Sequence, residues 1–376
     1  MFYKLIATAT FGLESIVAKE LKELGYDDLT VENGRVTFEG DERDIAICNM
    51  WLRTADRVLI KVGEFKAESF EELFEGTKAL DFGSIISQDG FMHVEGKSVK
   101  SKLHSVPDCQ SIVKKAVVES MKKKYNIEHF TEDGPEYKIE ISLLKDIATL
   151  TIDTSGAGLH KRGYRENAGT APMKETLAAA IVLISKWEPS RLLVDPMCGS
   201  GTIPIEAALI GKNIAPGLHR KFVCEDWDMM PPNIFEEIRK HAGSCVNNKE
   251  FVIQASDKDG RVFNTARANA EKAGVSEYIN FQKVPVESFS SKKKYGVIIT
   301  NPPYGERLGE EAEVEELYKN VGEVYRRLNE WSLYLITSYE GFEKCFGQKS
   351  DKNRKLYNGR LKCYLYQYIN KIKIKD

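Results

Sequence analysis

The apolar positions of the first 155 residues switch repeatedly between a spacing of two, typical of strands, and a spacing of three to four, typical of helices. Residues 13–25 show the helical spacing and end on Gly25, a common helix stop. Residues 30–40 predict a hairpin around Asn33-Gly34. This half therefore predicts small α+β units. Its other segments are a strand at 2–10, a helix then a strand at 44–65, a helix at 69–80, a strand at 91–99, a basic helix at 109–125 and two strands at 137–154.

The pattern changes after residue 155. Residues 155–172 are rich in glycine and basic side chains and have no periodicity, so we expect a domain boundary there. Strand-like and helix-like stretches then alternate, which predicts a doubly wound, mostly parallel sheet. The expected strands are 191–195, 251–257, 279–284, 296–301, 332–338 and 360–369, the last as an edge strand; the expected helices are 173–187, 201–211, 260–274 and 314–328.

Composition limits the class of protein. A formal net charge of -2 over 376 residues excludes a polycation, so any nucleic-acid surface must be a local patch. The 7 cysteines form no Cys-x-x-Cys pair, so no metal site is predicted, and their irregular spacing suits a reducing compartment. The N-terminus does not have the pattern of a signal peptide, and no apolar run reaches the roughly 18 residues of a membrane span. We expect a cytoplasmic protein without membrane contact.

A glycine-rich turn follows the strand that ends at Asp195. Gly199 and Gly201 lie between this strand and the next helix. Ligands of doubly wound sheets bind at the carboxyl ends of strands, where glycines allow close approach and a helix N-terminus presents unpaired amides. The spacing matches neither glycine-rich phosphate-binding motif, so a carboxylate suits the helix end better. The other interpretation is a tight strand-to-helix turn without a ligand.

Asp257 ends the next expected strand. An acidic side chain at this position commonly accepts hydrogen bonds from ribose hydroxyls. The alternative is structural, because Asp257 or Asp259 could cap the helix that follows. With the glycine-rich turn upstream, a nucleoside ligand is the favoured interpretation.

The strand at 296–301 ends in Asn301, Pro302, Pro303 and Tyr304. The Asn301 side-chain oxygen and the Pro302 carbonyl can each accept a hydrogen bond from an exocyclic base amine. The two prolines fix the backbone, so these acceptors are preorganised. Tyr304 offers a flat face for a flipped-out base. The alternative is an ordinary Asn-Pro turn.

Basic residues gather between positions 97 and 124, where only Asp108 and Glu119 oppose them. Such a run is often only a solvated helix face, but it also suits contact with a nucleic-acid backbone. The segment 160–165 is a second candidate, with a flexible linker as its alternative. The predicted RNA contacts are Lys97, Lys100, Lys102, Lys114, Lys115, Lys122, Lys123, Lys161, Arg162 and Arg165.

These motifs together carry a resemblance to a known family. DPMCGSGT (195–202), SDKDG (256–260) and NPPY (301–304), in this order, resemble motifs of class I S-adenosylmethionine-dependent methyltransferases that modify amines. APMKETLAAA (171–180), NIAPGLHRKF (213–222) and RKLYNG (354–359) resemble the RlmL-type 23S rRNA guanine-N2 methyltransferases, whose relatives are often described as N6-adenine DNA methylases. Residues 11–25 and 108–121 are similar to the ferredoxin-like segment and the RNA-binding THUMP domain of that family.

The resemblance implies the fold and the roles. It implies a ferredoxin-like segment at 1–60, a THUMP domain at 61–157 and a Rossmann-like methyltransferase domain at 158–376 with an antiparallel last strand. Asn301, Pro302, Pro303 and Tyr304 would hold the target base. Pro285 stands where many relatives have an aspartate, so no residue is assigned to the adenine ring. S-adenosylmethionine would contact Asp195, Pro196, Met197, Gly199, Ser200, Gly201, Thr202 and Asp257.

The expected function is methylation of an exocyclic base amine in RNA, with guanine N2 of 23S rRNA as the leading substrate. An N6-adenine methyltransferase acting on DNA or RNA would use the same tetrad. A third possibility is an RNA-binding assembly factor whose methyltransferase domain is inactive. The sequence does not determine the target nucleotide or the oligomeric state.

Overall fold

The computed structural model describes residues 1–165, 173–303 and 311–370. Its contacts divide the chain into two compact units. Unit 1 contains residues 1–9, 17–159 and 220–241, and unit 2 contains residues 10–16, 160–219 and 242–376. Two short segments belong to a different unit from the residues on either side of them in the sequence. Residues 10–16 pack in unit 2, and residues 220–241 pack in unit 1.

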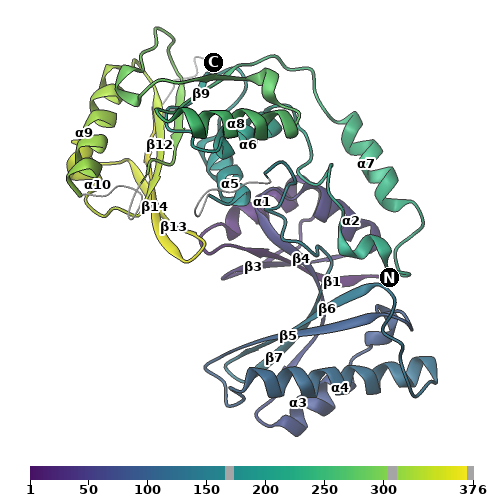
Figure 1. The fold of residues 1–376 in the computed structure, drawn as a ribbon. Coiled ribbons are helices and arrows are strands. Elements are labelled where there is room, and N and C mark those ends of the chain that lie inside the picture. Colours follow the sequence, from purple (N-terminus) through teal and green to yellow (C-terminus); the bar gives the residue numbers. More distant parts are fainter. Residues whose placement is uncertain (166–172, 304–310, 371–376) are drawn as a thin grey trace. The chain divides into compact units, whose positions relative to one another are not determined.

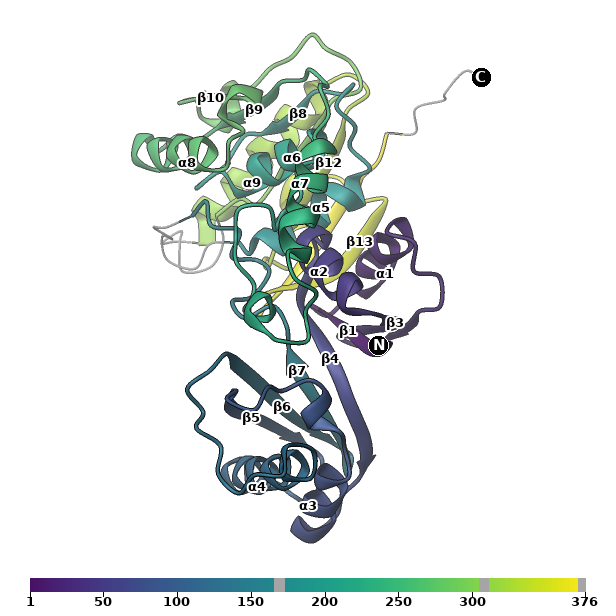
Figure 2. The ribbon, with the colours of Figure 1, turned by 90° about the vertical axis from the view of Figure 1, so that its right-hand side faces the viewer.

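Unit 1 is built on one seven-stranded sheet, in the order β2-β3-β1-β4-β7-β6-β5. All neighbouring strands are antiparallel except β5 and β6. The long strand β4 pairs with β1 through its first half and with β7 through its second half, so the expected limit at residue 60 lies inside a continuous strand (Figure 2). The strands are β1 (Tyr3–Ala9), β2 (Thr30–Glu32), β3 (Arg35–Gly40), β4 (Ala55–Lys66), β5 (Phe91–Val99), β6 (Glu136–Leu144) and β7 (Ile147–Asp153).

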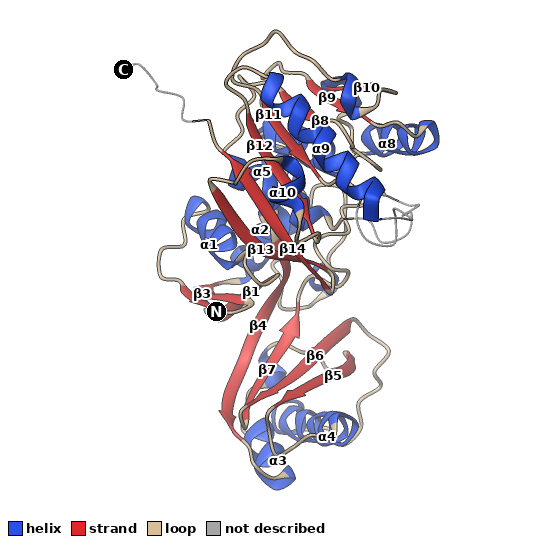
Figure 3. Cartoon of the chain, turned by 90° about the vertical axis from the view of Figure 1, so that its left-hand side faces the viewer, coloured by secondary structure: helices blue, strands red, loops and turns tan. Residues whose placement is uncertain are grey.

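The helices of unit 1 begin where the sequence provides caps. Asp41 and Ser69 each form a capping box at the start of a helix, because both their side chains and the acidic residues three positions later bond backbone amides. The longest helix packs against β5 and β6, as Figure 3 shows. The helices are α1 (Glu14–Glu23), which begins in unit 2, α2 (Glu42–Trp51), α3 (Phe70–Lys78) and α4 (Val106–Tyr125).

Unit 2 contains a second seven-stranded sheet, in the order β10-β9-β8-β11-β12-β14-β13. The first five strands are parallel to one another, β14 is antiparallel to β12, and β13 is antiparallel to β14; this confirms the predicted fold with its antiparallel last strand. The strands are β8 (Leu193–Asp195), β9 (Ile253–Ser256), β10 (Ile279–Gln282), β11 (Val297–Thr300), β12 (Ser332–Thr337), β13 (Lys352–Asn358) and β14 (Leu361–Tyr368).

Helices cover both faces of this sheet because alternate strand residues point to opposite sides. Val297 and Ile299 belong to one apolar core, and Ile298 belongs to the other. Figure 1 shows α9 and α10 on one face and α5, α6 and α8 on the other. The helices are α5 (Glu175–Ser185), α6 (Thr202–Gly211), α8 (Gly260–Lys272), α9 (Glu311–Arg327) and α10 (Phe342–Phe346); α7 (Ile234–Ser244) begins in unit 1.

One strand prediction is wrong in its position. Residues 360–369 were expected at the edge, but β14 lies between β12 and β13. The edge is β13, which the periodicity did not predict because only Leu356 is fully buried within it. No helix in the described ranges is long and apolar enough to cross a membrane.

Candidate functional site

The glycine-rich turn connects β8 to α6 at the carboxyl edge of the parallel strands. Gly199 and Gly201 both have positive φ, of 54° and 83°. A Cβ at Gly201 would lie 3.1 Å from the Cβ of Ala266 on α8, whereas a Cβ at Gly199 would enter open space. Gly201 is therefore required for packing, and Gly199 leaves the backbone open to a ligand.

Asp257 holds this turn against the end of β9. One of its carboxylate oxygens accepts a hydrogen bond from the amide of Gly199 at 3.0 Å, and the other accepts one from the amide of Asp259 at 3.0 Å. The N-cap of α8 is Asp259, whose side chain accepts from the amide of Arg261. Asp257 is thus not the cap, and its oxygens retain lone pairs for a further donor.

Asp195 lies at the end of β8 and is only 1 % exposed. Its Oδ1 accepts hydrogen bonds from the hydroxyl of Thr300, at 2.8 Å, and from the amide of Met197, at 3.2 Å. Burial raises the pKa of Asp195 to about 7, although both hydrogen bonds oppose this change. The result is a carboxyl group that can change its protonation state near neutral pH.

Asn301 follows β11, whose four residues are all buried. Its side-chain oxygen is buried and accepts no hydrogen bond from the described residues. Buried acceptors are rarely left unpaired, because the unmet desolvation costs about 1–3 kcal/mol. Among the described residues, the strand therefore ends in an acceptor that has no donor. Pro302 is buried and Pro303 half-buried, and Tyr304 lies outside the described residues.

The remaining predicted cofactor residues lie in the same turn. Pro196 is buried, Met197 is half-buried, and the carbonyl of Ser200 accepts a 2.9 Å hydrogen bond from the side chain of Asn269 on α8. The hydroxyl of Thr202 accepts one from Arg165 at 3.2 Å. Sequence reasoning missed Thr300 and Asn269 as supports of the site. A polar residue at the end of a buried strand, and one on the buried face of α8, were the available signals.

The structure does not support RNA contact by Arg162 and Arg165. The guanidinium of Arg162 lies 3.5 Å from the carboxylate of Glu206, which is 0 % exposed. Arg165 forms a 2.8 Å ion pair with Glu175, whose pKa burial raises to about 7. Both arginines are held inside unit 2, because a buried carboxylate needs a cation beside it. Both guanidinium groups therefore face carboxylates of unit 2, and RNA contact by either arginine stays a prediction.

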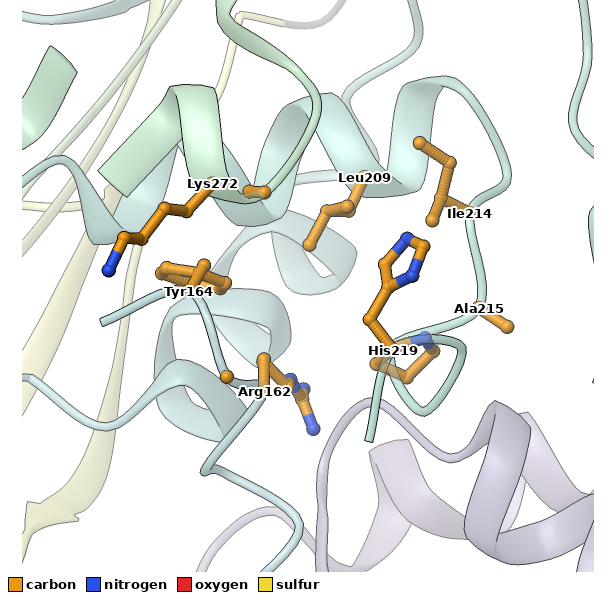
Figure 4. Close-up of a pocket in the computed structure, with 10 residues that line it drawn as sticks. Arg162, Tyr164, Leu209, Ile214, Ala215, His219 and Lys272 are labelled. Carbon is orange, nitrogen blue, oxygen red and sulfur yellow. The ribbon is translucent and has the colours of Figure 1, made fainter. Parts of the chain in front are cut away.

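A small hollow of unit 2 lies beside this buried network (Figure 4). Tyr164 and His219 line it, and the Tyr164 hydroxyl donates a 3.0 Å hydrogen bond to Glu206. The predicted linker segment around Arg162 is thus packed against α6 by hydrogen bonds and an ion pair. The alternative of a flexible linker does not hold for this part of it.

The lysines predicted to contact RNA lie on β5, on α4 and in the loop between them. Four of them form ion pairs: Lys97 with Glu140, Lys102 with Glu68, Lys114 with Glu132, and Lys122 with Glu128 and with Glu119 of its own helix. Lys100, Lys115 and Lys123 are exposed and have no ion-pair partner in the described part of the chain. The basic surface is therefore narrower than the sequence predicts.

Comparisons with known families agree with this architecture. Residues 162–367 match the family described as RMKL-like, methyltransferase domain. The chain belongs to this methyltransferase family. Residues 4–59 match the RlmL ferredoxin-like domain, and residues 67–153 match the THUMP domain. The predicted family membership is confirmed. The three domain matches fall in both units of the chain.

Three relatives extend the comparison. YpsC of Bacillus subtilis, named as a proposed RNA methyltransferase, is 52% identical over 99% of this chain and 97% of its own. A Listeria monocytogenes protein, described as a predicted N6-adenine-specific DNA methylase, is 53% identical over 98% of this chain and 96% of its own, with a TM-score of 0.93. SMU.472, a methyltransferase by description, was solved with SAH and is 46% identical over 98% of both chains, with a TM-score of 0.94.

Proposed function

We propose that the protein transfers a methyl group from S-adenosylmethionine to an exocyclic base amine of RNA, with guanine N2 of 23S rRNA as the leading substrate. The observation that carries this proposal is the buried side-chain oxygen of Asn301 at the carboxyl edge of the sheet, which has no hydrogen-bond partner within residues 1–165, 173–303 and 311–370. An acceptor in this state suits a substrate that brings an N–H donor. The THUMP match and the name of the YpsC relative support RNA as the polymer.

The residues of the turn fit the cofactor. Open space beside Gly199 allows close approach, and no side chain among the described residues caps the N-terminus of α6, so its amides can meet a carboxylate. Asp257 has lone pairs available for ribose hydroxyls, and Asp195 offers a carboxylate for an ammonium group. The SAH complex of a 46%-identical relative supports this ligand. Bound there, S-adenosylmethionine supplies an electrophilic methyl group.

Residues of this chain would increase the reactivity of the base amine by holding it in a fixed orientation. The lone pair of an exocyclic amine is delocalised into the ring. Two acceptors aimed at the amine protons, the Asn301 side-chain oxygen and the Pro302 carbonyl, favour a pyramidal nitrogen whose lone pair points away from the ring. Because the strand end and the prolines fix these acceptors, little reorganisation accompanies the transfer.

Two other functions use the same geometry. An N6-adenine methyltransferase would hold its amine between the same acceptors, and the name of the Listeria relative favours DNA as its substrate. An RNA-binding assembly factor would retain the fold without transfer. The intact acceptor at Asn301 favours activity, because an inactive protein could lose this buried unpaired oxygen and gain stability.

Nucleoside mapping tests the proposal. Purified full-length protein would be incubated with isotope-labelled S-adenosylmethionine and rRNA from a strain that lacks the protein, and the nucleosides would be separated by mass spectrometry. Label in N2-methylguanosine is the expected result. Label in N6-methyladenosine, or transfer to DNA and not to RNA, would replace the leading substrate. Cofactor binding without transfer to any nucleic acid would favour the assembly factor.

A further inference from the structure

A second feature of unit 2 lies on the hairpin formed by β13 and β14. Thr10, Phe11, Lys355, Tyr357 and Gly359 line an open hollow there. The ring of Phe11 is 48% exposed and meets the ring of Tyr357 edge-on, with centroids 5.9 Å apart and planes at 81°. A T-shaped pair of this kind leaves one ring face open beside the edge of the other.

The hollow has a well-defined shape, because the segment that carries Phe11 packs tightly against β13. Gly12 has a φ of 92°, and a Cβ there would lie 2.6 Å from the carbonyl oxygen of Lys355. On the two sides of this contact, Leu13 and Leu356 are both fully buried in the same apolar core. The exposure of Phe11 is therefore a property of a well-packed loop, not of a frayed terminus.

The hairpin that lines the hollow is rich in basic residues, whereas on the Phe11 side Glu14 accepts a hydrogen bond from the amide of Gly12. Residues 349–362 contain six lysines and arginines but only one acidic residue, Asp351. The ammonium of Lys355 lies 5.5 Å from the centroid of the Tyr357 ring, and Arg360 is exposed in the two-residue turn. Neither cation has a carboxylate partner among the ion pairs of the described ranges. Surfaces that bind single-stranded nucleic acid combine exposed aromatic rings, on which bases stack, with basic side chains that contact the phosphates.

The strand register places the hollow at the same edge of the sheet as the candidate site. Thr337, the last residue of the parallel strand β12, pairs with Tyr364 of the antiparallel strand β14. The turn at 359–360 therefore extends beyond the carboxyl end of β12, which is the end at which Asn301 follows β11. From β11 to β13 there are three strand intervals, or roughly 14 Å.

We propose that this hollow binds an unpaired base of the RNA substrate, close along the strand to the base that is modified. The base stacks on the rings of Phe11 and Tyr357, and Lys355 and Arg360 meet the adjoining phosphates. This inference rests on the proposed function, since it assigns part of the RNA to the methyltransferase unit. It implies a single-stranded or looped substrate, because bases within a duplex cannot enter a stacking site.

Binding without the methyl donor tests the inference. The probe is a short fluorescein-labelled oligouridylate, measured by fluorescence anisotropy with the full chain, beside a labelled RNA duplex. The test variant is Phe11→Ala/Tyr357→Ala, with Phe11→Leu/Tyr357→Leu as a second variant that keeps apolar bulk. Phe70→Ala is the matched control, because Phe70 is 40% exposed on α3.

We expect both double variants to bind the oligouridylate about tenfold more weakly, the loss of one base stack. Duplex binding and melting temperature should change little in the leucine variant, and Phe70→Ala should bind like wild type. Unchanged oligouridylate affinity in the leucine variant overturns the inference. A change of oligomeric state without a change of affinity also overturns it, in favour of a second copy of the chain as the occupant.

The two proposals fail separately. If the wild-type protein methylates no nucleic acid but binds oligouridylate through Phe11 and Tyr357, the proposed function is wrong and the stacking site stands. If the protein methylates RNA and the leucine variant keeps its KM for a looped substrate, the stacking site is wrong and the function stands.

Discussion

The hydroxyl of Thr300, the last residue of β11, donates a 2.8 Å hydrogen bond to the carboxyl group of Asp195, the last residue of β8. The two strands are neighbours in the sheet, so this bond joins the strand that leads to Asn301 with the strand that leads to the glycine-rich turn. The candidate base site and the candidate cofactor site thus share one buried contact. We therefore expect a change in the protonation of Asp195 to affect both the base site and the cofactor site.

Asp195 should make the stability of the protein depend on pH. Burial raises its pKa to about 7 in the folded state, whereas the unfolded chain has the ordinary value near 4. Between these values the folded state holds a proton that the unfolded state has lost, so this contribution to stability is present at acid pH and falls as the pH rises toward about 7. The slope is at most about 1.4 kcal/mol per pH unit.

Asp195→Asn should remove this slope. We expect the difference in unfolding free energy between wild type and variant to fall from about pH 4 to about pH 7 and to be flat above it, measured by urea unfolding. Glu175 has a raised pKa as well, but it is present in both proteins and cancels in the difference. Thr300→Val, which loses a donor to the ionised form, should extend the slope to higher pH. A pH-independent difference would contradict the assignment.

Asn301→Ala should separate activity from stability. The Asn301 oxygen is buried and has no hydrogen-bond partner in the described part of the chain, so its removal should leave the melting temperature unchanged or raise it slightly. If the oxygen accepts a hydrogen bond from the target amine, single-turnover methylation should fall by about 10²–10³-fold. Affinity for S-adenosylmethionine, measured by calorimetry, should be nearly unchanged.

Asn269→Ala is the matched control for that experiment. Asn269 is also buried, but its amide donates to the carbonyl of Ser200 and so supports the turn. Its removal should lower stability by roughly 1 kcal/mol and weaken cofactor binding. A loss of melting temperature in Asn301→Ala that accounts for its loss of activity would show that Asn301 only forms a turn.

The sequence predicts that Asp195, Asp257 and Asn301 gather at one edge of the sheet, because each lies at a strand end. Strands β8, β9 and β11 are short, buried and parallel, so their carboxyl ends meet at one edge whatever the details of the loops. Asp195, Asp257 and Asn301 each stand at or directly after such an end. Strand alternation with helices was sufficient to bring them together, without knowledge of any side-chain contact.

Other predictions failed where a partner comes from a distant segment. Arg162 seemed a surface cation, because nothing nearby in the sequence shows that Glu206 is buried beside it. The lysines of β5, of α4 and of the loop between them have few acidic neighbours in the sequence, and Glu140, Glu132 and Glu68 reach them only through folding. The edge strand β13 was missed because it is mostly exposed and lacks an apolar alternation.

Arg162→Met should destabilise unit 2 without changing its affinity for RNA. The variant leaves Glu206 buried with its cation removed, which typically costs about 3–5 kcal/mol. Arg162→Met/Glu206→Gln should recover most of this loss, because glutamine is neutral and still accepts from Tyr164. The unfolding free energies of wild type, the single variant and the double variant are measured by chemical denaturation. A stable single variant that binds RNA more weakly would restore the original prediction of a surface contact.

The ion pairs on the basic surface of unit 1 indicate which of its lysines should contact RNA. Lys100, Lys115 and Lys123 have no ion-pair partner in the described ranges, whereas Lys97 and Lys102 are paired with carboxylates. If the THUMP match reflects RNA binding, changing the three unpaired lysines to glutamine should flatten the plot of log K against log salt. Each lost phosphate contact reduces the slope by about 0.7–0.9.

The paired lysines are the control for this measurement. Changing Lys97 and Lys102 to glutamine removes two positive charges from the same surface but also releases Glu140 and Glu68. If phosphates bind only unpaired cations, this variant keeps the wild-type slope, although its affinity falls slightly through the freed negative charges. Equal slopes in both variants would mean that overall charge governs binding. An unchanged slope with reduced kcat in the unpaired-lysine variant would show that this surface does not contact RNA.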